Sequence, residues 1–255
     1  MAGFIDIFST NYLLIISFFA IAILYSSVGF GGGSSYLALL SLTLISFHEY
    51  RIIALICNII VVSGGTYLYY KNKLIDWKKV IPLVLFSVPM AFLGGYLEIN
   101  NHLFLILLGS VLIIASLLMF FVKNETFSQK KSKKEQKIHK NVIVGGIIGF
   151  ISGLVGIGGG IFLSPVLNLS KWDSVKKIAA TSSFFILVNS ISGLIGQVQN
   201  PAFKIDVNLT ITLAIIVLIG GQIGSRISIK ILNPTFIRTL TAILVGFVGI
   251  KILFS

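Results

Sequence analysis

Two glycine-dense segments are the part of this chain best suited to binding a ligand. The run Val-Gly-Phe-Gly-Gly-Gly at 28–33 returns as Val-Gly-Ile-Gly-Gly-Gly at 155–160, and each copy lies inside a long apolar stretch. Glycine lets the backbone approach a ligand closely and adopt positive φ. A helix that begins after such a run presents free N–H groups and a partial positive charge, which suit an anion. The repeat therefore predicts two backbone sites for an anionic ligand.

The predicted substrate-binding residues are the last glycines of each run and nearby hydroxyl and amide side chains. These side chains can donate hydrogen bonds to an oxyanion, but in membranes they also bond neighbouring helices, and glycines also permit close helix packing. Both interpretations stay open for each side chain. The candidates in the first half are Gly31, Gly32, Gly33, Ser34, Ser35 and Asn58. Those in the second half are Gly158, Gly159, Gly160, Ser182, Ser183 and Asn189.

The distribution of charged residues argues against a cation site. Cation transporters and pumps usually need a carboxylate within the membrane. All eight acids lie in loops, in tails or at the edges of apolar segments: Asp6, Glu49, Asp76, Glu98, Glu125, Glu135, Asp173 and Asp206. The single cysteine, Cys57, excludes an internal disulfide and a multi-cysteine metal site. We expect no metal, no cofactor and a small anion that is bound weakly, since no basic residue lies clearly at mid-depth either.

The composition places the glycine runs in a membrane protein. The 255 residues are 56% hydrophobic and 11% charged, with a mean hydropathy of +0.99, whereas a soluble domain carries about 25% charged residues. The net charge of +12 does not indicate nucleic acid, because the charges lie between apolar spans. We expect an all-α, multi-pass protein of the cytoplasmic membrane. Its partners would be the lipid bilayer and a small anion, and its oligomeric state is left open.

Ten apolar segments should position the glycine runs: 12–28, 34–47, 52–70, 80–97, 103–122, 142–155, 161–169, 178–198, 208–231 and 235–254. The second and seventh are short, so each should form a glycine-broken pair with the segment before it, whether re-entrant or spanning. Both ends of such a pair lie on one side of the membrane. The resulting map places 17 of the 20 basic residues in one set of loops and leaves Arg51, Lys204 and Lys251 in the other. Because basic loops stay in the cytoplasm, both termini are predicted to lie outside.

The two halves also match beyond the glycine runs. The matching segments are Arg51–Ala54 with Lys177–Ala180, Asp76 with Asp206, and Leu93–Gly95 with Ile223–Ser225. Each half holds one broken pair and three transmembrane helices, so the halves should face opposite ways as inverted-topology repeats. The predicted domains are a first repeat at 1–122, a basic cytoplasmic linker at 123–140 and a second repeat at 141–255.

At the glycine runs the chain resembles the TauE/SafE-type sulfite exporter family, also called the toluene sulfonate uptake permease family, over essentially its whole length. Members carry G-x-G-G-G near the start of each half, often followed by an apolar stretch that ends in proline. The second copy at 156–160 is followed by Pro165, whereas after the first copy Ala38 replaces the proline and Ser34-Ser35 replaces the usual apolar pair. The resemblance implies a permease for sulfur-containing anions such as sulfite, sulfonates, sulfoacetate or thiosulfate.

We therefore predict a permease that moves small anions by alternating access of the two halves around a central site. A channel or facilitator would use the same glycine site without alternating closure, and the sequence does not separate the two. An intramembrane serine hydrolase is a third interpretation, because Ser34 or Ser35 adjoins glycine and His48 could act as a base. Those groups lie at opposite ends of one short segment, however, and hydrolysis does not need a duplicated fold.

Overall fold

The computed structural model describes residues 2–27, 29–43, 45–121, 138–170, 172–199, 205–230 and 234–254. Over these residues the helices are α1 (Ala2–Ser26), α2 (Gly33–Leu40), α3 (Phe47–Lys71), α4 (Trp77–Tyr96), α5 (Asn101–Phe121), α6 (Ile138–Val155), α7 (Gly160–Leu169), α8 (Val175–Val198), α9 (Val207–Lys230) and α10 (Pro234–Leu253). The prediction of an all-α protein is confirmed, and each apolar segment corresponds to one of these helices. Five helices of the described part are long and apolar enough to cross a membrane, as a multi-pass protein requires.

α2 and α7 are short helices that begin directly after the glycine runs. Their N-caps, Gly32 and Gly159, have left-handed φ values of 86° and 79°, which glycine adopts without a Cβ penalty. α2 ends at Leu40, earlier than the segment 34–47 predicted, because a turn in which Thr43 N–H donates to Leu40 O follows it. With 8 and 10 residues, the two helices are about 12 and 15 Å long, about half the hydrocarbon thickness of a bilayer.

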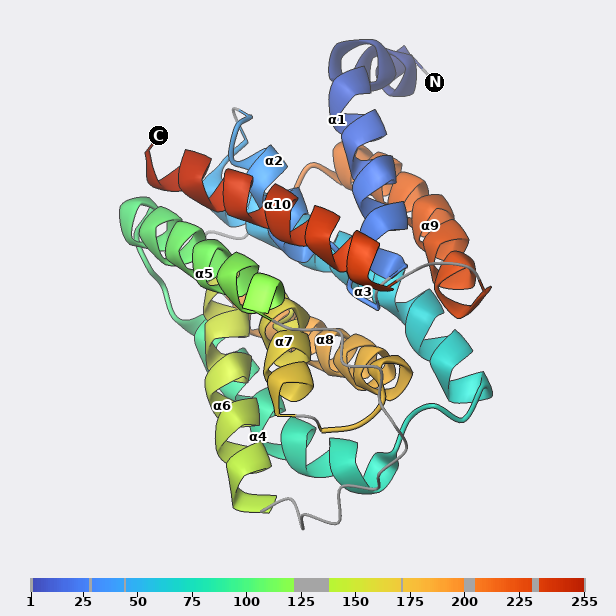
Figure 1. The fold of residues 1–255 in the computed structure, drawn as a ribbon. Helices are drawn as coiled ribbons and strands as arrows, with labels where there is room; N and C mark the ends of the chain where they lie inside the picture. The colour runs from blue at the N-terminus through green and yellow to red at the C-terminus, as the bar shows by residue number, and fades with distance from the viewer. Residues whose placement is uncertain are drawn as a thin grey trace.

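The helices of the two halves pack in exchanged pairs (Figure 1). α1 of the first half lies against α9 of the second, and α6, the counterpart of α1, lies against α4, the counterpart of α9. α5 packs against its own counterpart α10, and α3 packs against its counterpart α8. These contacts map onto one another when the halves are exchanged, which is consistent with a duplicated fold. The inverted orientation of the halves in the membrane stays a prediction.

Glycines in α4 and α9 allow two of these helix pairs, α4 with α6 and α9 with α1, to pack closely. A Cβ on Gly94 would meet the backbone of Phe150 in α6, and a Cβ on Gly224 would meet the backbone of Ile23 in α1. Gly94 and Gly224, which the sequence aligned, therefore have equivalent packing roles in the two halves.

α3 and α8, the third helices of the two halves, align with a different residue offset from the one that the sequence suggested. A Cβ on Gly29 would lie 2.8 Å from the Ala179 carbonyl oxygen, and a Cβ on Gly156 would lie 3.9 Å from Arg51 Cβ. Packing beside the glycine runs thus equates Arg51 with Ala179, two positions beyond the Lys177 of the sequence alignment.

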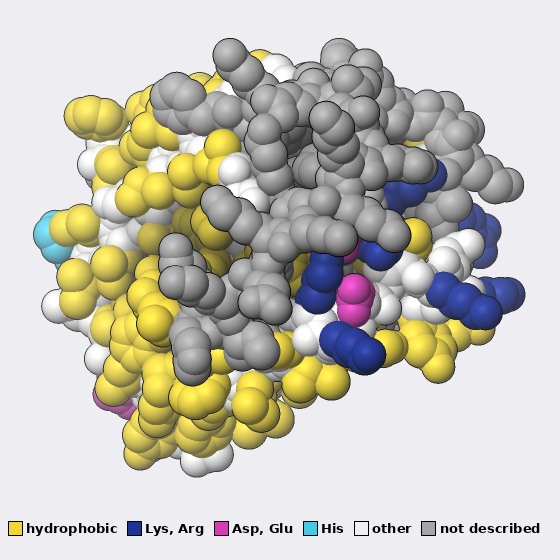
Figure 2. Space-filling view, turned by 60° about the horizontal axis from the view of Figure 1, so that its bottom comes forward, with side chains coloured by type: hydrophobic (Ala, Val, Ile, Leu, Met, Phe, Trp, Pro, Cys, Tyr) yellow, Lys and Arg dark blue, Asp and Glu magenta, His cyan; other side chains and the backbone are white. Residues whose placement is uncertain are grey.

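The surface is consistent with lipid contact. Leu13, Leu85 and Phe247 are 68%, 64% and 68% exposed, and Figure 2 shows hydrophobic side chains over much of one face, with Lys and Arg gathered on one side of it. Large exposed apolar surfaces mark interaction sites, including membrane contacts. Of the linker predicted over 123–140, residues 123–137 lie outside the described residues, and α6 begins at Ile138. The cytoplasmic side of the basic loops stays a prediction.

Candidate functional site

The two glycine runs meet at the amide of Asn58, in the middle of α3. Asn58 Oδ1 accepts a hydrogen bond of 3.2 Å from the Gly33 N–H, in the first turn of α2. Asn58 Nδ2 donates to the Ile157 carbonyl at 3.4 Å and to Ser190 Oγ of α8 at 2.8 Å. This side chain is only 1% exposed. A single buried amide therefore joins the first glycine run, the second glycine run and α8.

Glycine at three positions leaves the space that this amide occupies. A Cβ on Gly31 would overlap Asn58 Oδ1, and a Cβ on Gly33 would lie 3.0 Å from Asn58 Cγ. A Cβ on Gly158 would overlap Asn58 Nδ2 and lie 2.5 Å from Ser190 Oγ. The structure thus brings four predicted site residues, Gly31, Gly33, Asn58 and Gly158, into one cluster.

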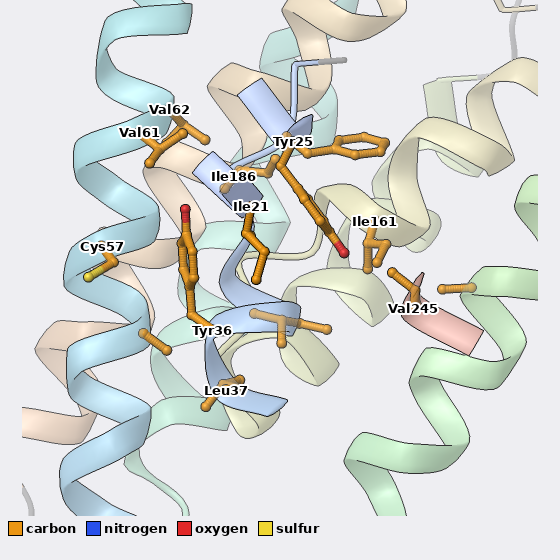
Figure 3. Close-up of a cluster of buried hydrophobic side chains, with 14 of the residues drawn as sticks. Ile21, Tyr25, Tyr36, Leu37, Cys57, Val61, Val62, Ile161, Ile186 and Val245 are labelled. Atoms are coloured by element: carbon orange, nitrogen blue, oxygen red, sulfur yellow. The ribbon is translucent and has the colours of Figure 1, made fainter. Parts of the chain in front are cut away.

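The first turn of α2 adds hydroxyl groups to the first glycine run. Ser34 and Ser35 are 4% and 2% exposed, and Ser35 Oγ shares a 2.6 Å hydrogen bond with Tyr25 Oη of α1. Tyr36 lies in the same buried cluster as Tyr25 (Figure 3). A Cβ on Gly32 would lie 2.9 Å from Tyr36 Oη, so this hydroxyl lies beside the N-cap of α2. We call Tyr25, Ser34, Ser35 and Tyr36 the hydroxyl cluster.

The residues that follow the second glycine run are apolar. Ile161-Phe162-Leu163 stands after the second run where Ser34-Ser35-Tyr36 stands after the first. A Cβ on Gly159 would lie 3.1 Å from Phe185 Cε1 and 3.1 Å from Ser152 Cβ, so Ser152 is a polar neighbour of this N-cap. The two runs are alike in backbone, but hydroxyl-bearing residues follow the first run and apolar residues follow the second.

The remaining candidates lie on α8, where Ser182, Ser183 and Asn189 are at most 1% exposed. Ser183 Oγ shares a 3.0 Å hydrogen bond with Thr66 Oγ1, which ties α8 to α3. Asn189 Nδ2 donates to the Phe185 carbonyl of its own helix at 2.8 Å. Ser182 lies beside the start of α7, and its hydroxyl has no hydrogen-bond partner among the described residues. Ser183 and the Asn189 amide nitrogen are thus engaged in helix contacts, whereas Asn189 Oδ1 and the Ser182 hydroxyl have no partner among the described residues.

Arg51, which the sequence map placed in an outer loop, is buried beside the second glycine run. It is 3% exposed, and its Nη2 donates to the Leu154 carbonyl at 2.6 Å. Its guanidinium also lies 5.5 Å from the centroid of the Phe104 ring. Leu154 is in the last turn of α6, where the carbonyl end carries partial negative charge. Arg51 therefore stabilises the end of α6 directly before the glycine run.

Sequence reasoning did not select Tyr25, Tyr36, Ser190 or Arg51 as site residues. One signal was available for the tyrosines, because they lie inside apolar segments, whereas membrane tyrosines are enriched at the two interfaces. Ser190 lies in the same apolar segment, 178–198, as the candidates Ser182, Ser183 and Asn189, and Arg51 is a charged residue at the edge of the segment 52–70. Their roles depend on partners about a hundred residues away in the chain, as the bonds to Asn58 and Leu154 show.

Acidic side chains join the two halves at helix ends, away from the glycine runs. Asp173, before α8, forms a 2.6 Å ion pair with Lys79 of α4 and lies 3.8 Å from Lys177. Glu49 of α3 accepts a 2.6 Å hydrogen bond from the Asp206 N–H, before α9. Because α3 and α9 are the counterparts of α8 and α4, we call these two contacts the paired latches. Among the described residues, no group of three or more His, Cys, Asp or Glu could hold a metal ion.

Comparison with known proteins gives a consistent result. The family model for the sulfite exporter TauE/SafE matches residues 13–252. The "Probable membrane transporter protein y4hK" of Sinorhizobium fredii is 31% identical over 246 residues, which cover 94% of this chain and 97% of that protein. The "Probable membrane transporter protein MJ0441" of Methanocaldococcus jannaschii is 30% identical over 260 residues, 94% of each chain. No solved structure matches.

Proposed function

The chain belongs to the sulfite exporter TauE/SafE family, and we propose that it is a permease that carries small anions across the cell membrane between its two glycine runs. The family and its relatives support a membrane transporter, which favours this function over a serine hydrolase. Sulfur-containing anions such as sulfite or sulfonates are the proposed substrates. The observation that carries the proposal is the meeting of the N-terminus of α2 and the second glycine run at Asn58.

Asn58 Oδ1 indicates which kind of atom the N-terminus of α2 binds. It is an oxygen with partial negative charge, and it accepts a hydrogen bond from the Gly33 N–H. An anion oxygen that arrives at α2 would compete for the same N–H. Each helix terminus favours an anion by about 0.3–1 kcal/mol, so a ligand bound in this way can also be released. Among the described residues no Asp or Glu side chain is buried, which leaves a cation without the carboxylate that it needs.

The paired latches support alternating access over a channel. Each joins the start of a third helix in one half to the start of a fourth helix in the other half. If the halves are inverted, the latches lie on opposite sides of the membrane. Opening one while the other stays closed would then expose the glycine runs to one side at a time. A channel has no need for two such contacts.

The first latch gives a testable prediction. Lys79→Gln removes the ion pair with Asp173. The side chains of Lys79 and Asp173 are 36% and 16% exposed, which indicates an interaction of about 1 kcal/mol. We expect a several-fold change in the maximal transport rate, about fivefold for that energy, with little change in KM. The matched control is Lys177→Gln, which removes the longer 3.8 Å contact to the same carboxylate and should behave as wild type. Equal rates in the wild type and Lys79→Gln would contradict a gating role.

The pH dependence of this latch follows from Asp173. Burial raises the pKa of this carboxyl, but the hydrogen bonds from Lys79 and the Ser174 N–H, with the charges of Lys79 and Lys177, outweigh burial and hold the pKa below its ordinary value. The contribution of the latch is therefore complete above the unfolded pKa of about 3.9 and is lost as the pH falls through the lower folded value. Titration of Asp173 should not change transport near neutral pH.

Uptake by the purified protein in liposomes tests the proposed function. We expect saturable uptake of one or more of sulfite, thiosulfate, short sulfonates and carboxylates, and competition among them. Competition by divalent cations, with none by any of these anions, would contradict the proposal. Accumulation of the anion against its own gradient, driven by a coupling ion, would distinguish the permease from a channel.

A further inference from the structure

We propose that the hydroxyl of Tyr36 is the side-chain donor that selects an oxygen-bearing anion at the first glycine run. The inference rests on the proposed transport function and assigns a role within that site. Tyr36 is 0% exposed, and its Oη has no hydrogen-bond partner among the described residues. A buried hydroxyl without a partner destabilises the fold, and native proteins satisfy most such groups. A transported anion is the acceptor that would satisfy this hydroxyl.

The position of the ring directs the hydroxyl to the N-terminus of α2. The ring stacks on Phe18, with centroids 4.5 Å apart and planes 18° apart, so packing fixes its orientation. A Cβ on Gly32 would lie 2.8 Å from Tyr36 Cζ, 2.9 Å from Tyr36 Oη and 3.0 Å from Ile21 Cγ2. The hydroxyl is therefore next to the left-handed N-cap, with an apolar side chain beside it (Figure 3). Under this proposal, the hydroxyl and the Gly33 N–H, which now donates to Asn58 Oδ1, serve the same small ligand.

The first run has a phenol donor for which the second run has no counterpart. Tyr25 is buried nearby, but its hydroxyl is already bonded to Ser35 at 2.6 Å. In the second half, Leu163 occupies the position that Tyr36 has in the first half, and it has no donor. Ser152 and Ser182 near the second run also have hydroxyls without a partner among the described residues. We assign the oxyanion group to the first run, because its phenol would add a charge-assisted hydrogen bond to the attraction of the helix dipole.

Removal of the hydroxyl separates a binding role from a packing role. Tyr36→Phe retains the ring that stacks on Phe18 and removes a hydroxyl that has no partner in the described protein. A binding role predicts weaker substrate binding together with an unchanged or higher Tm, because the fold loses no hydrogen bond. A structural role predicts a lower Tm. The matched control is Tyr50→Phe, at the start of α3. This buried tyrosine loses a hydroxyl that donates to Asn101 Oδ1 of α5 at 3.4 Å.

The experiment measures sulfite and methanesulfonate uptake by the full-length protein in liposomes, and the Tm with and without each anion. In Tyr36→Phe we expect the KM to rise about tenfold, the loss expected for one hydrogen bond to a charged ligand. The anion should also raise the Tm of Tyr36→Phe less than that of the wild type. Tyr50→Phe should retain the wild-type KM and the wild-type Tm shift. A wild-type KM and Tm shift in Tyr36→Phe would overturn the inference and leave the proposed function intact, whereas a wild type that transports no anion would overturn the proposed function itself.

Discussion

Replacement of Asn58 by leucine should abolish anion transport and lower the free energy of unfolding. Leucine has a similar size but cannot bond the Gly33 N–H, the Ile157 carbonyl or Ser190 Oγ. A buried polar group left without a partner costs about 1–3 kcal/mol, and Gly33 and Ile157 would each be left so. We expect a loss of at least about 2 kcal/mol in stability, measured by denaturation in detergent. We expect no detectable uptake in liposomes, because the two glycine runs would no longer be held together.

Two further variants make this result specific. Asn58→Asp keeps an oxygen that can accept from Gly33 but loses both donated bonds and places a negative charge where the anion should bind. It should fail to transport even where it folds. Asn168→Leu is the control, because the Asn168 amide donates to Ser164 O within α7 at 2.8 Å and has no hydrogen bond to a second element in the described part of the chain. Wild-type uptake by Asn58→Leu would show that the amide does not build the site.

The backbone of the site was predictable because its signal is local. Four glycines in five residues within an apolar stretch predict irregular backbone, and both runs do end in glycine N-caps with positive φ. The apolar segments likewise predicted every described helix, since hydrophobicity and length are sufficient to identify a membrane helix. The end of α2 was predicted too late, because apolar residues after Leu40 do not force a helix to continue.

The side chains of the site were harder to predict because their partners are distant in sequence. Asn58 was selected from its polarity, but its bonds to Ile157 and Ser190 span 99 and 132 residues. Arg51 looked like a loop residue, yet it reaches across 103 residues to the end of α6. Such pairings depend on how α3 crosses α8 and α6, which neither periodicity nor composition specifies.

The second large effect should come from alanine at the two N-cap glycines. Gly32→Ala and Gly159→Ala place a Cβ on residues with φ values of 86° and 79°, and the left-handed conformation costs about 1–2 kcal/mol for a residue other than glycine. At Gly32 the Cβ would lie 2.8 Å from Tyr36 Cζ, and at Gly159 it would lie 3.0 Å from Ile148 Cγ2. Each variant should lose about 1–3 kcal/mol of stability and most of its transport. Substitution here should affect folding as well as transport, since the Cβ meets protein atoms before any ligand binds.

The matched control for these variants is Gly146→Ala in α6. A Cβ there would lie 3.8 Å from Met90 Cγ and 3.9 Å from Phe86 Cβ, which is ordinary contact, and alanine favours a helix by about 1 kcal/mol over glycine. Gly146→Ala should therefore be at least as stable as the wild type and transport normally. Gly156→Ala adds a second comparison, because its φ of +82° is also left-handed but its Cβ would come no closer than 3.4 Å to another atom. If the glycines act through close approach at the N-caps, Gly156→Ala should lose stability but retain more transport than Gly32→Ala or Gly159→Ala. Equal losses in all three would attribute the effect to backbone strain alone, and normal transport by Gly32→Ala and Gly159→Ala would exclude both N-caps from the site.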